Sequence, residues 1–133
     1  MSVAVECVKD KQTQKHIVLT VGHLIRKEVK ELCSNKISSV QRYRDAKSLQ
    51  NFSWDAIVDE AAQHAPNLVH LLMECTKKYK KREAARINQK SIIGICISLI
   101  CKHQNHKMSV VQKMLGLILY AGHTAKQVSV STN

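Results

Sequence analysis

The chain has 133 residues, which suits one domain, and 21 Lys and Arg against 10 Asp and Glu give it a formal net charge of +11. One proline and four glycines exclude collagen-like and Pro/Gly-rich linker classes and argue against a turn-rich β-sandwich. The longest uncharged apolar segment, residues 91–101, is well short of the ~20 residues that a membrane span needs. Acidic and basic residues near the N-terminus also exclude a signal peptide, so we expect no membrane association.

The cysteines indicate the compartment. Their number, five, is odd, and no secretory signal precedes them. Free thiols that pack as small hydrophobic residues are typical of a reducing environment, whereas a disulfide framework needs an oxidising one. We therefore expect a nuclear or cytoplasmic protein.

Helical periodicity begins after an aperiodic lead-in over residues 1–14. Apolar residues then recur with a helical period and predict a helix from about 16 to 34, which Asn35 can end. The apolar stripe of this helix consists of Val18, Val21, Ile25, Val29, Leu32 and Cys33. Residues 37–44 are predicted to form a shorter helical piece, and residues 48–51 a polar connector.

The clearest helix start in the chain lies at Ser53. Its hydroxyl can cap the free amides of a first turn, and Asp55 stands where the helix dipole favours an anion. Pro66 ends this helix and can open the next one as its first residue. Trp54 and Ile57 are expected to anchor the core. The other apolar positions predicted to be buried are Val58, Ala61, Ala62, Leu68, Leu71, Leu72 and Cys75.

Two apolar helices are predicted in the second half. Residues 88–103 are apolar nearly all round, and although isoleucine runs also favour a β-strand, the length of the segment and its helical neighbours favour a helix. The next helix is expected to start at Ser109, which has capping-box spacing with Gln112, and to run through Tyr120. Gly122 can end it, with a short last helix after it.

These elements predict an all-α fold. We expect a single compact domain of about six helices over residues 15–128, with a basic segment between helices and a flexible tail over residues 129–133. Gly94 and Gly116 lie in mid-helix, where glycine costs about 1 kcal/mol relative to alanine. The missing side chain is expected to allow another helix to approach closely at both positions.

Four motifs resemble an uncharacterised family of invertebrates and fish whose members are long, mobile-element-like proteins with a domain of unknown function. The motifs are Phe52-Ser53-Trp54, His64-Ala65-Pro66, Met108-Ser109-Val110-Val111-Gln112 and Tyr120-Ala121-Gly122-His123. The resemblance spans residues 33–128 and covers the N-terminal helical region of the family, whose members continue beyond it. It implies an excised domain or a truncated relative, and it implies no activity or catalytic residue.

A basic run is the main candidate binding site. It consists of Lys77, Lys78, Lys80, Lys81, Arg82, Arg86 and Lys90, with Glu83 as the one acidic residue among them. Such a run can contact the phosphates of nucleic acid or another polyanion, serve as a nuclear-import signal, or simply form a solvated loop. Residues 67–133 carry eleven Lys and Arg against two acids, which favours a cationic surface there. The next candidates are Arg42, Arg44, Lys102 and Lys107.

No constellation in the sequence indicates an enzyme, a cofactor or a small-molecule substrate. Cys96, Cys101, His103 and His106 are zinc-ligand residue types. On a continuous helix, however, the two cysteines lie about 140° apart around the axis, so we expect no metal site. Glycine-rich phosphate loops are absent, and no cysteine or histidine has the base and oxyanion site that a nucleophile needs.

Two functions therefore remain open. The first is a non-catalytic helical adaptor that binds nucleic acid or another polyanion through its basic second half. The alternative is a protein-interaction or homo-oligomerisation module, in which the lysine run is only an import signal. Few aromatic residues and an all-round apolar helix that needs covering favour the alternative.

Overall fold

The computed structural model describes residues 9–78 and 83–131, and the side chains of residues 9–78 and 88–123. Within these ranges there are six helices and no strand, which confirms the predicted all-α fold. The helices are α2 (Lys11–Leu32), α3 (Ala46–Gln50), α4 (Trp54–His64), α5 (Pro66–Thr76), α6 (Glu83–Gln104) and α7 (Val110–Ser131). The isoleucine-rich segment lies in α6 and is helical rather than extended.

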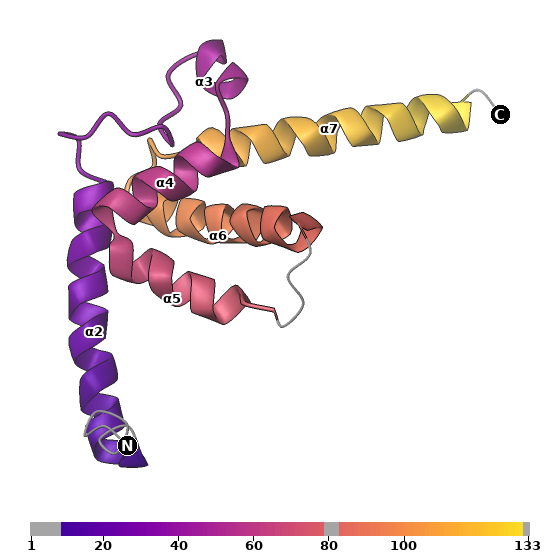
Figure 1. The fold of residues 1–133 in the computed structure, drawn as a ribbon. Helices are drawn as coiled ribbons and strands as arrows, with labels where there is room; N and C mark the ends of the chain where they lie inside the picture. The colour runs from indigo at the N-terminus through magenta and orange to yellow at the C-terminus, as the bar shows by residue number, and fades with distance from the viewer. Residues whose placement is uncertain (1–8, 79–82, 132–133) are drawn as a thin grey trace.

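Four of the helices enclose the core (Figure 1). α4, α5 and α6 pack against one another, and the C-terminal end of α2 packs across them. The core residues are Val29, Leu32, Cys33, Val58, Ala61, Ala65, Leu68, Val69, Ile93, Ile97, Cys101 and Met108. The first half of α2 and most of α7 project from this body in different directions (Figure 1).

α2 begins earlier than its apolar pattern predicts. The expected start near His16 is wrong, because Asp10 caps the helix and accepts hydrogen bonds from the Gln12 amide at 3.3 Å and the Thr13 hydroxyl at 2.7 Å. The bonds from Thr13 and Gln12 also lower the pKa of Asp10. The first turns of α2 touch no core, so they carry no apolar period that could reveal them.

The segment between α2 and α4 also differs from the prediction. Residues 37–44 form a bend, a turn and irregular chain rather than a helix, because their polar groups bond to other parts of the fold. The Glu60 carboxylate of α4 accepts from the Ser39 hydroxyl and the Val40 amide. The helix lies instead at α3, where a polar connector was expected, and the reciprocal capping box of Asp45 and Ser48 starts it.

α4 and α5 start where the sequence predicts. The Ser53 hydroxyl accepts from the Ala56 amide, and Pro66 is the first residue of α5. The buried side of α5 is shifted from the expected one. Leu71 and Cys75 are exposed and Val69 is buried instead, because the helix presents its Leu68–Val69 side to the core.

A residue of α2 caps the N-terminus of α5. The N-cap position of α5 is Ala65, which has no side-chain acceptor. The buried carboxylate of Glu28 takes this role and accepts from the Asn67 amide at 3.1 Å, the Asn67 carboxamide at 2.7 Å and the Leu68 amide at 3.1 Å. A carboxylate here also matches the helix dipole. Glu28 therefore links α2 to α5 through hydrogen bonds inside the fold.

The expectation of close helix approach holds at one of the two glycines. A Cβ on Gly94 would lie 2.5 Å from Cε3 of Trp54, so α4 approaches α6 through this missing side chain. A Cβ on Gly116 would meet nothing within 4 Å, so the prediction is wrong there. Ile57 is buried as expected, whereas Trp54 is half-buried and lies against Gly94.

The C-terminal part of the chain forms one helix rather than two. α7 continues through Gly122 to Ser131, so the predicted end at Gly122 and the separate last helix are wrong. Gly122 does not adopt the left-handed conformation that ends helices. The expected capping box at Ser109 is also absent, because the Gln112 side chain donates to the Ser98 carbonyl of α6 instead.

Candidate polyanion and protein interfaces

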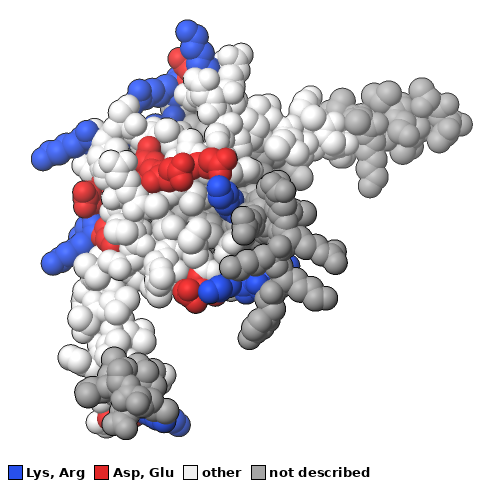
Figure 2. All heavy atoms as spheres, in the orientation of Figure 1, with Lys and Arg blue, Asp and Glu red and all other residues white. Residues whose placement is uncertain are grey.

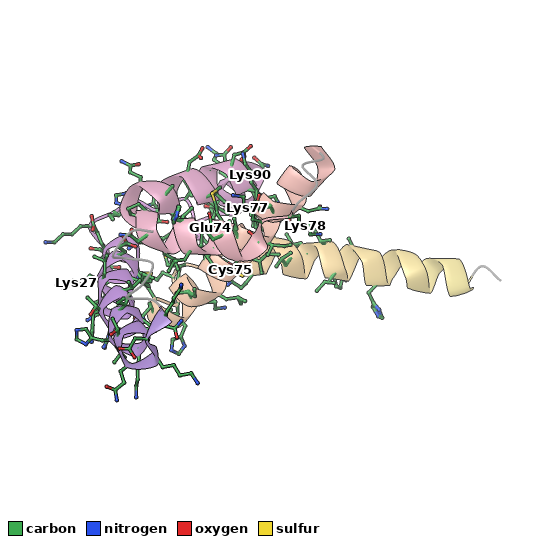
Figure 3. All side chains as sticks on the ribbon, turned by 60° about the horizontal axis from the view of Figure 1, so that its bottom comes forward. Lys27, Glu74, Cys75, Lys77, Lys78 and Lys90 are labelled. Atoms are coloured by element: carbon green, nitrogen blue, oxygen red, sulfur yellow. The ribbon has the colours of Figure 1, made fainter. Side chains whose placement is uncertain are left out.

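The structure describes part of the predicted basic run. Lys77 and Lys78 follow α5 and are exposed, and Lys90 lies in the first half of α6. The side chain of Arg86, and Lys80, Lys81 and Arg82 entirely, lie outside the described part of the chain. Figure 3 shows Lys77, Lys78 and Lys90 gathered near Glu74 at the C-terminal end of α5, with Lys27 apart from them on α2. The three described lysines of the run therefore share one region of the surface.

Lys90 differs from the other lysines because it forms an ion pair. Its Nζ lies 2.5 Å from the Asp55 carboxylate of α4, and this hydrogen bond and charge raise the pKa of Lys90. Acidic side chains gather over α4 on the face seen in Figure 2. They belong to the helix that carries Asp55, Asp59 and Glu60. A phosphate would have to displace Asp55 from Lys90, so Lys77 and Lys78 are the better phosphate ligands of the three.

The end of α5 is fixed to the start of α6. The Gln89 carboxamide donates to the Met73 carbonyl at 3.2 Å and to the Thr76 hydroxyl at 3.0 Å. These bonds hold the C-terminal end of α5, and with it the start of the basic run, against α6. The contact between α5 and α6 therefore brings Lys77 and Lys78 close to Lys90.

A second cationic region lies where residues 39–44 meet the turn between α6 and α7. The Tyr43 amide donates to the Lys107 carbonyl, and the Val110 amide donates to the Gln41 carbonyl. The Nζ of Lys113 stands 4.2 Å from the centroid of the Tyr43 ring. The backbone that carries Arg42 and Arg44 thus lies against Lys107, so three of the secondary candidates from the sequence come from neighbouring segments.

Four consecutive large apolar residues are exposed on α7. Leu117, Ile118, Leu119 and Tyr120, which we name the α7 apolar segment, are between 52% and 73% exposed. Successive helical residues are 100° apart, so four in a row face every side of the helix. Soluble proteins seldom leave such a surface open to water unless it serves as an interface. The sequence predicted that this helix is apolar but did not show that it leaves the body.

The four residues of zinc-ligand type differ in burial. Cys101 is fully buried in the core, where the hydrogen bond with Cys33 and burial raise the pKa of its thiol. Cys96 is half-buried, and His103 and His106 are exposed. No group of three or more metal-ligating side chains occurs in the described part of the chain. Burial supports a packing role for Cys101.

Comparison with other proteins adds no relative. No family model, no curated protein and no solved structure matches this chain. The described helices include none that is both long and apolar enough to cross a bilayer. The resemblance to the mobile-element-like family thus remains a prediction from the sequence motifs.

Proposed function

We propose that this protein is a non-catalytic helical interaction module that self-associates through the α7 apolar segment. The observation that carries the proposal is the exposure of four consecutive large apolar side chains on a helix that projects from the body (Figure 1). A helix that is apolar all round is normally buried. An isolated helix is also marginally stable in water, so packing against other helices would stabilise the outer part of α7.

The charge distribution supports a second copy of the chain as the partner. Two molecules of net charge +11 repel each other wherever their cations meet. Residues 114–123 of α7 contain no Lys, Arg, Asp or Glu. Contact along this stretch therefore brings no like charges together and buries no charged group. The same stretch holds the most exposed apolar side chains of the described chain.

Charged substitutions in the α7 apolar segment are expected to abolish self-association. In the Ile118→Asp/Leu119→Asp variant, the dissociation constant should rise at least tenfold, since full burial of one such side chain contributes about 1.5–3 kcal/mol. Light scattering over a hundredfold range of concentration should give a mass above 15.0 kDa for the wild type and that of a monomer for the variant. The melting temperature of the core should change little, because both side chains are exposed.

Gln14→Asp is the matched control, because it adds an acid to an exposed position on α2, away from α7. It should associate as the wild type does. A wild-type chain that stays monomeric over the whole range of concentration would contradict self-association.

A second candidate function is binding of nucleic acid or another polyanion through the basic run. The observation that favours it is that Lys77 and Lys78 are exposed at the end of α5 and have no ion pair with a carboxylate in the described part of the chain. Residues 67–133 contain eleven Lys and Arg against two acidic residues, and this positive charge adds long-range attraction for phosphates. The alternative role of the basic run is that of a nuclear-import signal.

Neutralising the lysines of the basic run is expected to weaken binding without unfolding the protein. The Lys77/78/80/81→Gln variant should lose up to four phosphate contacts, each of which contributes about 0.7–0.9 to the slope of log K against log salt. Fluorescence anisotropy with labelled DNA and RNA measures the slope, and circular dichroism checks the helices. The Lys11/15/27/30→Gln variant removes the same charge from α2 and should change the slope less.

Equal weakening by both variants would show that binding follows net charge alone. Failure of the wild type to bind any nucleic acid at low salt would contradict the second candidate and leave the import role.

A further inference from the structure

A shallow pocket lies in the segment between α2 and α4. Its volume is about 230 Å³, and its lining includes Ser38, Arg42, Arg44, Ser48 and Asn51. Arg42 and Arg44 both line it, whereas the ring of Tyr43, which lies between them in the chain, packs under Lys113 of α7. The pocket therefore combines two guanidinium groups with hydroxyl and carboxamide groups.

The two guanidinium groups are bonded only to neutral oxygens within the described chain. Nη2 of Arg42 donates to the Ser34 carbonyl and to the Asn35 side chain, both at 2.9 Å. Nη2 of Arg44 donates to the Ser38 hydroxyl at 2.7 Å. Neither Arg has a carboxylate partner among the described residues. Both positive charges are thus held in place without being neutralised.

The nearby acidic groups are already engaged. One oxygen of Glu60 accepts from the Ser39 hydroxyl and the other from the Val40 amide. Asp45 accepts from the Ser48 amide, as part of the capping box of α3. These bonds engage both carboxylates with donors other than the Arg side chains. The Arg44 guanidinium and Nη1 of Arg42 keep donors for an anion, whereas both donors of Arg42 Nη2 are used and its Nε is buried.

The backbone that carries Arg42 and Arg44 is fixed on both sides. Tyr43 and Gln41 are bonded to Lys107 and Val110 at the α6–α7 turn, and the Arg42 amide donates to the Ser39 carbonyl. The Ser48 hydroxyl of α3 accepts from the Arg44 amide at 3.2 Å. A site of this kind is preorganised, because its cations are positioned before a ligand arrives.

We propose that Arg42 and Arg44 form a binding site for a phosphate group of a nucleic-acid backbone. The planar guanidinium of Arg44 can bind phosphate with two parallel hydrogen bonds, and Nη1 of Arg42 and the hydroxyl and carboxamide groups beside it add further donors. A backbone phosphate suits the site because the pocket is open to solvent and lies on a chain of net charge +11, which attracts an extended polyanion. The inference deepens the polyanion candidate, on which it rests, and is independent of self-association.

Anisotropy of fluorescein-labelled single-stranded DNA tests the site. The Arg42→Gln/Arg44→Gln variant should bind at least tenfold more weakly at low salt, and its slope of log K against log salt should fall by about 1.4, for two lost contacts. Arg42→Lys/Arg44→Lys should restore the slope but not the full affinity, because lysine keeps the charge and lacks the planar fork. Arg26→Gln/Lys27→Gln, which removes two exposed charges from α2, should have a much smaller effect.

Folding is controlled separately, because Arg42 also bonds to Ser34 and Asn35. If the double variant has a lowered melting temperature, Arg44→Gln alone carries the test, since its partner Ser38 is exposed. It should lower the slope by about 0.7.

The possible failures are distinguishable. Unchanged DNA binding by the Arg variants, with weakened binding by the Lys77/78/80/81→Gln variant, would overturn the site and leave the polyanion function. Absence of binding by the wild type would overturn both. A phosphoserine peptide serves as a second probe. If the Arg variants bind this peptide more weakly than the wild type does, while their DNA binding is unchanged, the assignment to nucleic acid is overturned.

Discussion

Replacing Glu28 with alanine is expected to lower the free energy of unfolding by about 3 kcal/mol, since each buried donor that loses its acceptor costs about 1–3 kcal/mol. The Asn67 and Leu68 amides would lose their only carboxylate, and Ala65 offers no cap in its place. The favourable charge at the N-terminus of α5 would be lost as well. Urea unfolding, followed by circular dichroism, measures the change.

Two further variants separate the contributions. Glu28→Gln keeps an acceptor oxygen and loses the charge, so it should cost about 1 kcal/mol. Glu31→Ala removes an exposed carboxylate of the same helix, 3.8 Å from the His64 ring, and should change stability by less than about 0.5 kcal/mol. Equal stability of Glu28→Ala and Glu31→Ala would contradict the capping role of Glu28.

Substitution of Gly94 is expected to destabilise the fold in proportion to the size of the new side chain. A Cβ at this position would lie 2.5 and 2.8 Å from two carbons of the Trp54 ring, which is too close for contact. Gly94→Ala should cost about 1–2 kcal/mol, because overpacking costs up to about 3 kcal/mol and the gain in helix propensity offsets about 1 kcal/mol. Gly94→Val, which is larger and a poorer helix former, should cost about 3 kcal/mol.

Substitution of Trp54, which faces Gly94 across the contact between α4 and α6, tests whether the clash is the cause. Trp54→Leu should relieve the clash, so Gly94→Ala should be less harmful in that background, by more than about 0.5 kcal/mol. Gly22→Ala is the matched control, because it lies in mid-helix with nothing within 4 Å of the added Cβ. It should stabilise the protein by up to about 1 kcal/mol. Additive effects of the Gly94 and Trp54 substitutions would contradict the close approach of α4 and α6.

The helix starts at Ser53 and Pro66 were predictable because their signals are local. A hydroxyl that caps a first turn and a proline that lacks an amide act within a few residues, whatever surrounds them. The helical state of residues 88–103 also followed from the length of the apolar segment. By contrast, capping-box spacing at Ser109 and Gln112 was misleading, because Gln112 bonds to Ser98 of α6. Spacing identifies a local bond only where no partner from another helix competes for the side chain.

The candidate sites, too, were predictable from the sequence only in part. Composition identified the basic run and the secondary arginines, because charge and residue type are visible in the chain. It did not show that Lys90 pairs with Asp55, nor that Arg42 and Arg44 share one pocket. The ion pair joins α6 to α4, and the pocket forms where residues 38–44 fold back on α3, so only the tertiary structure reveals them.

The sequence by itself determined the helical class, the excess of basic residues and the starts of α4 and α5, because each depends on residue type and short-range spacing. The tertiary structure alone decided which donors and acceptors meet over long distances, as at Glu28 with α5 and Glu60 with the Ser39–Val40 turn. It also decided that α7 leaves the body with its apolar segment exposed. The physical reason is that an apolar period shows that a helix needs a neighbour, whereas only the packing of the other helices shows whether the chain itself supplies one.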